Sequence, residues 1–199
     1  MDQLHIILED CHRCIAYMER LYGDDEATGQ LWEAGTGYFL HEMNMFVLVT
    51  QAAKVFCPGS SQALALQKLA GAVRHPDNHG TLEHMLTVPR EHEPKAQWHD
   101  VTEVYDWVER CRLALRPHAA TMDHIRAVRN SVTAHTQAHH EQGKPNHPPS
   151  ELPELTALVQ TGSTMLSELY TGMTGWSRAP WIDDKSFDRL IAGYSPVPR

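Results

Sequence analysis

The chain lacks the features that mark several specialised classes of protein. Its 199 residues include only four cysteines, which do not make the disulfide framework of a small secreted domain. Cys11 and Cys14 form a C-x-x-C motif, but both lie on or beside an apolar helical stripe and no second pair follows. We therefore expect buried thiols there rather than a redox or metal site. No apolar run reaches the roughly 18 residues of a membrane span, and acidic residues interrupt the N-terminus where a signal peptide would be apolar. We expect a soluble protein of the reducing cytoplasm, without membrane contact.

Positive charge is scarce as well. The chain has 17 Lys and Arg against 25 Asp and Glu, a net charge of −8 with histidine neutral. A protein that binds nucleic acid through a broad basic surface would not have this balance. Any nucleic-acid role must therefore rest on a local basic patch, which oligomerisation would repeat. Histidine, in contrast, is abundant: there are 14, and many can titrate near neutral pH.

Apolar residues recur at helical spacing along most of the chain, and no strand pattern or internal repeat is present. The predicted helices cover residues 4–22, 30–56, 60–69, 81–86, 98–115, 122–135 and 152–169, with Ser60 or Ser61 and Thr81 as expected N-caps. We predict an all-α fold, a helical bundle of four to five main helices with short extra helices, over residues 1–172. An irregular tail, residues 173–199, is expected to pack on the bundle or on a partner through its aromatic side chains.

The longest predicted helix, residues 30–56, carries two apolar ridges. One ridge consists of Tyr38, Met45, Val49, Ala52 and Phe56, and the other of Phe39, Met43, Phe46 and Ala53. Two ridges give a wide apolar arc, which predicts a helix that is buried on this wide arc near the centre of the bundle.

The stretch "RAVRNSVTAHTQAHH" raises a different question, because it places charged residues beside an apolar stripe. At about 100° per residue, Arg129 falls about 45° to one side of the apolar line of its helix and His135 about 75° to the other. A guanidinium cannot lose its charge, and burying it unpaired is costly. Arg129 therefore needs a carboxylate, the C-terminus of a helix, a cleft or a subunit interface.

The order Arg129-Asn130, four residues, then His135 resembles the Arg–His signature of HEPN domains. The fuller string "IRAVRNSVTAHT" is similar to the AbiU2-type branch, which is associated with abortive phage-infection systems. The similarity extends to "YFLHEMNMFVLVTQAAKVF" followed by "SSQALALQKL", and covers roughly residues 4–170. The resemblance implies a homodimer in which two motifs form one composite cleft, and a metal-independent endoribonuclease that needs no cofactor. It also suggests a toxin or phage-defence effector with an antitoxin protein as a further partner.

Carried over to this sequence, the resemblance makes Arg129 and His135 the catalytic pair and Asn130 the polar position beside the arginine. Cleavage of RNA without a metal uses the ribose 2′-hydroxyl as nucleophile, so it needs a proton acceptor, a proton donor and positive charge at the phosphate. Histidine serves as acid or base, and arginine offers a planar fork to phosphate oxygens. Asn130 would orient the histidine or bond a phosphate. Arg126 is a candidate substrate contact, with pairing to Asp123 or Asp10 as its structural alternative.

Two other interpretations remain open. The chain can be a non-catalytic interaction module of the same fold, with Arg129 paired inside the bundle. It can also be a helical-bundle metal-dependent hydrolase of the DinB kind, because His135 and His139 have i, i+4 ligand spacing. Further ligands would come from distant residues such as His41, Glu42 and His118, and no Glu follows His135 as the zincin motif requires. His139, His140 and His147 flank a proline-rich loop and are expected to form a solvated surface.

Overall fold

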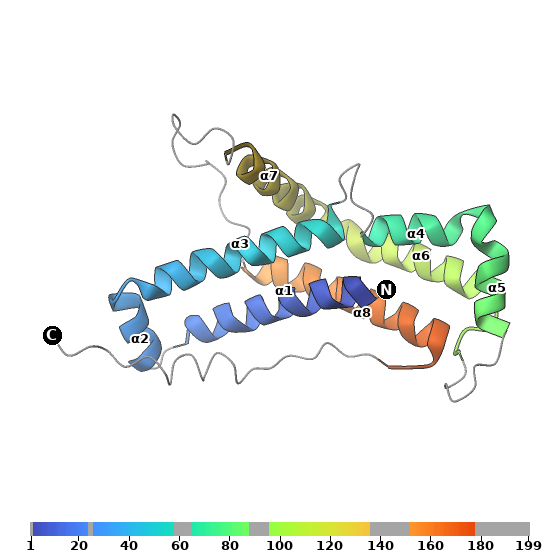
Figure 1. The fold of residues 1–199 in the computed structure, drawn as a ribbon, viewed down its shortest axis with the longest axis horizontal. Coiled ribbons are helices and arrows are strands. Elements are labelled where there is room, and N and C mark those ends of the chain that lie inside the picture. The colour runs from blue at the N-terminus through green and yellow to red at the C-terminus, as the bar shows by residue number, and fades with distance from the viewer. Residues whose placement is uncertain (1, 24–25, 58–64, 88–95, 136–151, 178–199) are drawn as a thin grey trace.

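The computed structural model describes residues 2–23, 26–57, 65–87, 96–135 and 152–177, with the backbone alone for 131–135. The described elements are all helical. Five are long: α1 (Asp2–Leu21), α3 (Thr36–Phe56), α6 (Val101–Leu115), α7 (Ala119–His135) and α8 (Leu152–Thr174). Shorter elements are α2 (Glu26–Glu33), α4 (Leu66–Arg74), α5 (His79–Thr87) and the 3-10 turns η1 (Pro76–Asn78) and η2 (Arg116–His118). The predicted all-α bundle of main helices with short extra ones is confirmed (Figure 1).

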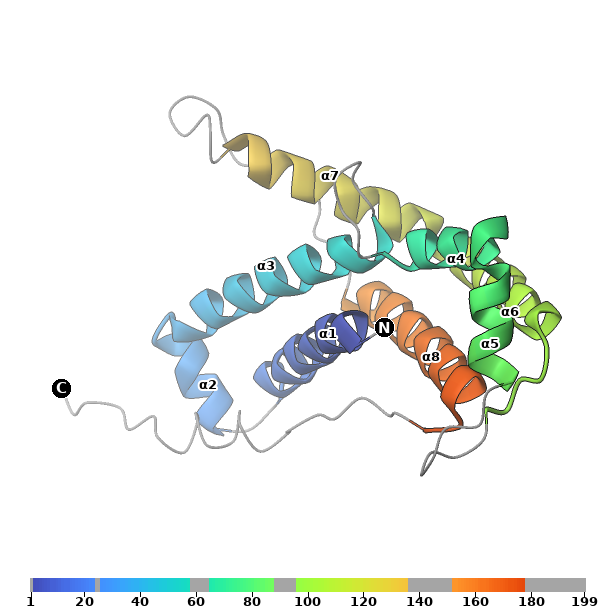
Figure 2. The same ribbon diagram turned by 45° about the vertical axis from the view of Figure 1, so that its right-hand side comes forward.

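The helices enclose one main core. α1 packs along α3 and against α8, while α6 packs against α8 and is covered by α4 and α5. α2 lies at the far end of α3, as both ribbon views show (Figures 1 and 2). The largest fully buried side chains of the core are Leu8, Met18, Leu48, Phe56, Trp107, Ile125, Leu155, Leu158 and Leu166. No described helix is long and apolar enough to cross a membrane.

The prediction of one helix from residue 30 to residue 56 is wrong, because the chain breaks at Gly35. This glycine has a φ of 76°, in the left-handed region that side chains disfavour. The backbone N–H of Gly35 donates to the carbonyl of Trp32, which ends α2. Gly37 is then needed for close packing, because a Cβ there would lie 2.7 Å from the Trp32 ring.

The prediction that this helix is buried on a wide arc is wrong for its N-terminal half. Tyr38, Phe39, Met43 and Phe46 are 66%, 63%, 46% and 50% exposed, and burial on α3 becomes continuous only from Leu48 onward. The four exposed side chains lie in the first three turns of α3, where the Trp32 ring contacts that of Tyr38 edge-on at a centroid distance of 5.0 Å. The apolar spacing identified a face of the helix correctly but not what lies against it.

Other helix ends differ from prediction by a few residues. α6 begins at Val101 rather than at Trp98, because Asp100 accepts from the N–H groups of Thr102 and Glu103 in a capping box. α5 begins at His79, so Thr81 lies inside it and is not its N-cap. α4 begins at Leu66 with Ala65 at its N-cap, while Ser60 and Ser61 lie outside the described residues.

The predicted domain boundary at residue 172 falls in the last turn of α8. α8 runs to Thr174, two residues past the predicted boundary, and residues 178–199 of the predicted tail lie outside the described residues. The predicted burial of Cys11 and Cys14 is confirmed, at 0% and 7% exposure. Burial raises the pKa of both thiols, that of Cys14 to about 11, so neither is a reactive thiolate near neutral pH.

Candidate functional site on helix α7

Helix α7 carries the Arg–His motif and is anchored to the bundle by its first half. Thr121 and Ile125 are buried, and the Cys57 thiol donates to the Met122 carbonyl at 3.1 Å. Beyond this anchor the helix diverges from α3, and its C-terminal half extends away from the other labelled helices in both ribbon views (Figures 1 and 2). The motif therefore lies where α7 leaves the bundle.

Arg129 is half-buried at this point and is held at the C-terminal end of α3. Its Nη1 donates to the carbonyl of Cys57 at 2.7 Å. Cys57 is the C-cap residue of α3, where carbonyl groups lack helical partners and the helix dipole is negative. Of the partners that the sequence required for Arg129, the structure supplies the helix C-terminus.

Asn130 is exposed and serves Arg129 directly. Its Oδ1 accepts from Arg129 Nη2 at 3.1 Å and from Arg129 Nε at 3.3 Å. The amide thus orients the guanidinium plane. The sequence analysis did not include this role, because it expected Asn130 to orient the histidine or to bond a phosphate. Arg126 is exposed and pairs with Asp123 at 2.5 Å. The Asp123 alternative for Arg126 is confirmed, whereas the Asp10 carboxylate bonds Arg13 and Gln51.

His135 is the last residue of α7, and its side chain lies outside the described residues. The backbone still limits what this residue can do within one chain. Six helical positions separate it from Arg129, which corresponds to about 9 Å along the axis and about 120° around it. On a regular helix the two positions therefore lie on different faces.

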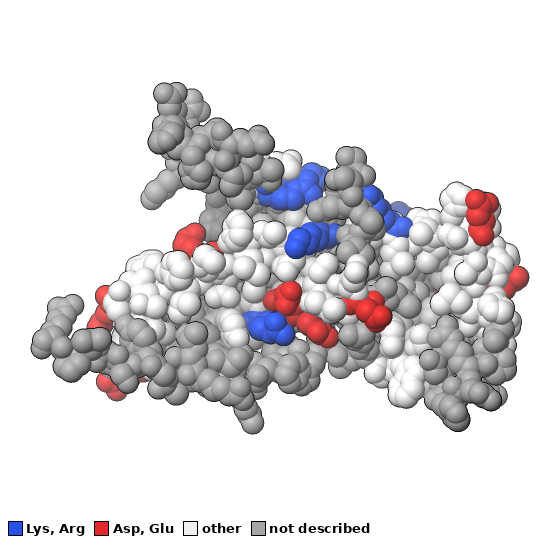
Figure 3. All heavy atoms as spheres, in the orientation of Figure 1, with Lys and Arg blue, Asp and Glu red and all other residues white. Residues whose placement is uncertain are grey.

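The surface around Arg129 is a local basic patch in an acidic protein. It comprises Arg126 and Arg129 on α7, whose charges both act on Cys57 at the end of α3, and Asp123 pairs with Arg126; we call it the α3–α7 basic patch. Figure 3 shows Lys and Arg gathered over α7 and the C-terminal part of α3. Burial raises the pKa of the Cys57 thiol beneath the patch, and both arginines oppose that rise through their charge. A chain with net charge −8 needs at least one local basic patch of this kind in order to bind nucleic acid.

The residues considered as distant metal ligands do not gather with the motif. His41 forms a hydrogen bond with the Tyr22 hydroxyl at 3.0 Å. It lies sixteen residues before Cys57, which corresponds to about 24 Å along α3. His118 bonds the Thr161 hydroxyl at 3.1 Å. Within the described ranges no three His, Cys, Asp or Glu side chains are placed to hold a metal ion. His139, His140 and His147 lie outside those ranges.

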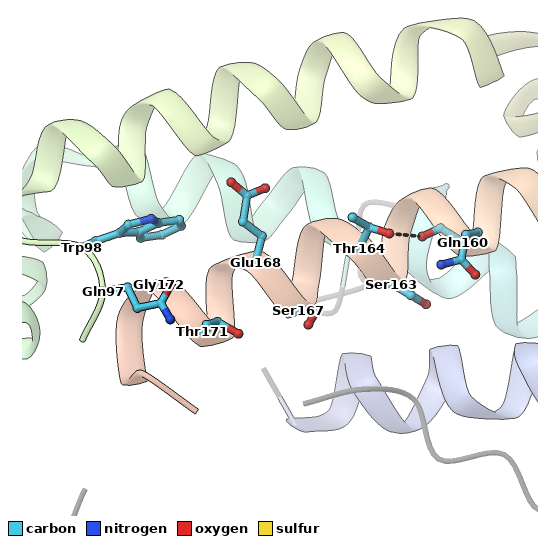
Figure 4. Close-up of a pocket in the computed structure, with 9 residues that line it drawn as sticks. All are labelled: Gln97, Trp98, Gln160, Ser163, Thr164, Ser167, Glu168, Thr171 and Gly172. Carbon is cyan, nitrogen blue, oxygen red and sulfur yellow. Dashed lines mark hydrogen bonds between the residues drawn. The ribbon is translucent and has the colours of Figure 1, made fainter. Parts of the chain in front are cut away.

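A polar pocket of about 540 Å³ lies along α8 (Figure 4). It is lined by Gln97, Trp98, Gln160, Ser163, Thr164, Ser167, Glu168, Thr171 and Gly172. Several of its polar groups bond to the protein: Ser163 Oγ lies 2.7 Å from His12 Nε2, and Thr164 donates to the Gln160 carbonyl. Glu168 pairs with Arg110. Burial lowers the pKa of His12, so its ring is neutral at pH 7. We interpret the His12–Ser163 contact as polar packing between α1 and α8.

Sequence reasoning missed Cys57 as the partner of Arg129. A signal for it was present, because Cys57-Pro58 ends a long helix and the carbonyls at such an end attract cations. The spacing of residues does not predict which cation reaches that helix end, since Arg129 comes 72 positions later in the chain. Comparisons of the chain with models of known protein families, with curated proteins and with solved structures find no match.

Proposed function

We propose that this chain is a HEPN-like, metal-independent endoribonuclease that works as a homodimer. The observation that carries the proposal is the placement of Arg129. Its guanidinium is fixed by the Cys57 carbonyl and by Asn130, next to Arg126, where α7 leaves the bundle. A preoriented guanidinium suits a phosphate whose charge grows during the reaction. Arg126, also in the patch, would contact the RNA backbone.

In the proposed reaction the ribose 2′-hydroxyl attacks the adjacent phosphorus. His135 of one chain accepts the hydroxyl proton, and the bond from phosphorus to the 5′-oxygen breaks. The second chain's copy of the same histidine donates a proton to that leaving oxygen. Arg129 stabilises the negative charge on the phosphate oxygens. The products are a 2′,3′-cyclic phosphate and a 5′-hydroxyl end, and the reaction needs no metal.

A dimer would bring together residues that one helix separates. Phe39, Met43 and Phe46 form an exposed apolar stripe, here called the α3 stripe. Steps of three and four residues continue it through Thr50 and Ala53 to Cys57, so all six lie on one face of α3. α7 of the same chain contacts this face at Cys57. The α3 stripe is thus the continuation of the α7 contact, and we propose that the second chain binds there.

The test uses full-length protein, single-stranded RNA and excess EDTA. Wild type is expected to release fragments ending in 2′,3′-cyclic phosphate, while Arg129→Ala and His135→Ala lower the rate by at least ~100-fold. Matched controls are Arg110→Ala and His84→Ala, two exposed residues on other helices, which should cut as wild type does. Activity that survives both motif variants, or that depends on an added metal, would refute the proposal.

A second candidate is a non-catalytic interaction module, favoured by two observations together. Arg129 has a structural role at the end of α3, and the α3 stripe is an exposed apolar surface. This alternative predicts a stable dimer that leaves RNA intact. The same RNA assay separates the two functions, because the module shows no cyclic-phosphate product at any protein concentration. The antitoxin partner and the phage-defence setting are proposals that depend on the endoribonuclease.

A further inference from the structure

A second hollow in the molecule is mostly apolar and lies away from Arg129 and His135. It has a volume of about 590 Å³ and lies between α4, α6, the start of α7 and α8. Its interior is formed by Leu66, Ala70, Trp107, Val108, Leu115 and Met165. Pockets of this size and character are typical of small-molecule sites. Neither the proposed nuclease reaction nor the α3 stripe uses it.

The space exists because two facing helices present side chains of unequal size. On α4 the lining residues Gln67, Ala70, Gly71 and Arg74 recur at i, i+3, i+4 and i+7, and so form one face. Gly71 is exposed at the edge of this face, and a Cβ there would meet no atom within 4 Å. The facing residues of α6 lie at the same spacing, from Val108 to Leu115. A small residue where a helix normally carries a large one leaves an open channel along both helices.

The interior of the channel is apolar and uncharged. Leu66, Trp107 and Leu115 are 2%, 0% and 7% exposed. The Trp107 indole N–H is already used, because it donates to the Met165 carbonyl at 2.9 Å. Burial raises the pKa of the Cys111 thiol in the wall to about 12, so the thiol is neutral. A ligand body in this channel therefore meets hydrocarbon, sulfur and aromatic surface.

The rim, in contrast, is cationic. Arg74, Arg112 and Arg116 all line the opening. Glu109 alone pairs with both Arg74 and Arg112, and these two hydrogen bonds lower the pKa of its carboxyl. Arg116 pairs with no carboxylate among the described residues. Three guanidinium groups thus share one paired carboxylate, on a chain whose net charge is −8. The rim is therefore positively charged although the whole protein is negatively charged, which favours binding of an anion at the rim.

We propose that this pocket binds an amphipathic anion, an acyl chain that carries a carboxylate or a phosphate group. The lining residues of α6 run from Trp107 to Leu115, about 12 Å along the helix, so the channel is elongated and suits a chain better than a compact ring system. The acyl chain lies against the apolar interior. The head group lies at the rim, where Arg112 and Arg116 bond its oxygens.

Such a ligand would also touch the base of the motif-bearing helix. Met122 lines the pocket, and the carbonyl of the same residue accepts from the Cys57 thiol. Because binding to the pocket does not require Arg129 or His135, the proposal stands or falls independently of the nuclease.

The first experiment compares ligands that share a ten-carbon chain, titrated into the full-length protein below their micelle concentrations. The probes are decanoate, decyl phosphate, decanol and decyltrimethylammonium. At least one of the two anions is expected to bind with one-to-one stoichiometry and about tenfold more tightly than decanol, the effect of one charge-assisted hydrogen bond. The cation is expected to bind more weakly than decanol. Which anion binds better identifies the head group. Equal binding of all four probes, or binding of none, would overturn the proposal.

The second experiment fills the channel. Gly71→Leu places a side chain in the open space without an atom to clash with, and leucine favours the helix more than glycine does. Gly80→Leu on α5, also in open space but outside the pocket, is the matched control. Gly71→Leu should abolish decanoate or decyl phosphate binding, whereas Gly80→Leu should keep it. Arg116→Gln, at an exposed position, should weaken the anion about tenfold and leave decanol unchanged. Wild-type binding by either Gly71→Leu or Arg116→Gln would contradict the assigned site.

Discussion

The two ends of α3 are built from similar residues but have different surroundings. The C-terminal end, from Leu48 to Phe56, is enclosed by α1, α4 and α7, which all contact α3. The N-terminal end contacts α1 and α2, and its outer face carries the exposed α3 stripe. Equally apolar side chains therefore stabilise the fold at one end of the helix and remain available for binding at the other. Burial, rather than residue type, decides which role an aromatic side chain has.

Phe56→Ala is the substitution expected to have the largest effect on stability. The ring is fully buried and lies so close to α8 that a Cβ on Gly162 would be 2.5 Å from its tip. Removing it leaves a cavity and should lower the free energy of unfolding by about 3–5 kcal/mol. Urea denaturation followed by circular dichroism, at low protein concentration, measures this loss.

The matched variant at the other end of α3 is Phe46→Ala, in which the same ring is removed from a side chain that is 50% exposed. Its free energy of unfolding should stay within about 0.5 kcal/mol of wild type under the same conditions. If the two variants lose the same stability, the difference between the two ends of α3 does not hold. A large loss for Phe46→Ala alone would place that ring in the core.

Arg129→Ala is expected to have a smaller effect, at the junction between the buried end of α3 and α7. The variant leaves the Cys57 carbonyl without its charged donor at a half-buried position, which should cost about 1–2 kcal/mol. Arg126→Ala removes only an exposed i, i+3 pair with Asp123, for which about 0.3–0.5 kcal/mol is typical. Thermal unfolding of both variants measures the contrast. An equal effect would mean that the Arg129–Cys57 contact does not stabilise the protein more than a surface pair does.

The sequence was sufficient to predict the all-α class and most of the helices, because apolar periodicity is a local property. It predicted the burial of Cys11 and Cys14 for the same reason. It failed at Gly35, where one left-handed residue within an otherwise helical pattern separates α2 from α3. It also failed for Phe39 and Phe46, since their exposure depends on where α7 diverges, which is a property of tertiary packing.

The candidate site was predictable only in part. A charged residue beside an apolar stripe identified Arg129 and the kind of partner that it needed, including a helix C-terminus. The partner itself, and the use of Asn130 to hold the guanidinium, depend on the crossing of α3 and α7. The pocket between α4 and α6 had no sequence signal, because the predicted helix ended at residue 69, before Gly71, and only the structure brings Gly71 and the α6 residues to one pocket.

The smallest expected effect on folding, and the most informative for the dimer, comes from changing the α3 stripe. The double variant Phe39→Ser and Phe46→Ser removes two exposed rings and leaves the core of Phe56 and Trp107 intact. Its circular dichroism spectrum and its melting temperature at low concentration should match those of wild type. In solution, however, the mass measured by light scattering should fall from that of two chains to that of one, because the dimer loses its apolar contact.

The matched control for this variant is Leu113→Ser. Leu113 is an apolar residue that is 54% exposed, and it lies on α6 rather than on α3. It should leave the mass of the proposed dimer unchanged, so that dissociation of the double variant can be assigned to the stripe rather than to a general loss of apolar surface. If the double variant remains a dimer, the second chain binds elsewhere. If it becomes a monomer and still cuts RNA at the wild-type rate, a composite cleft is not needed. Arg129 and His135 of one chain would then act together, although a regular helix places the two positions about 120° apart.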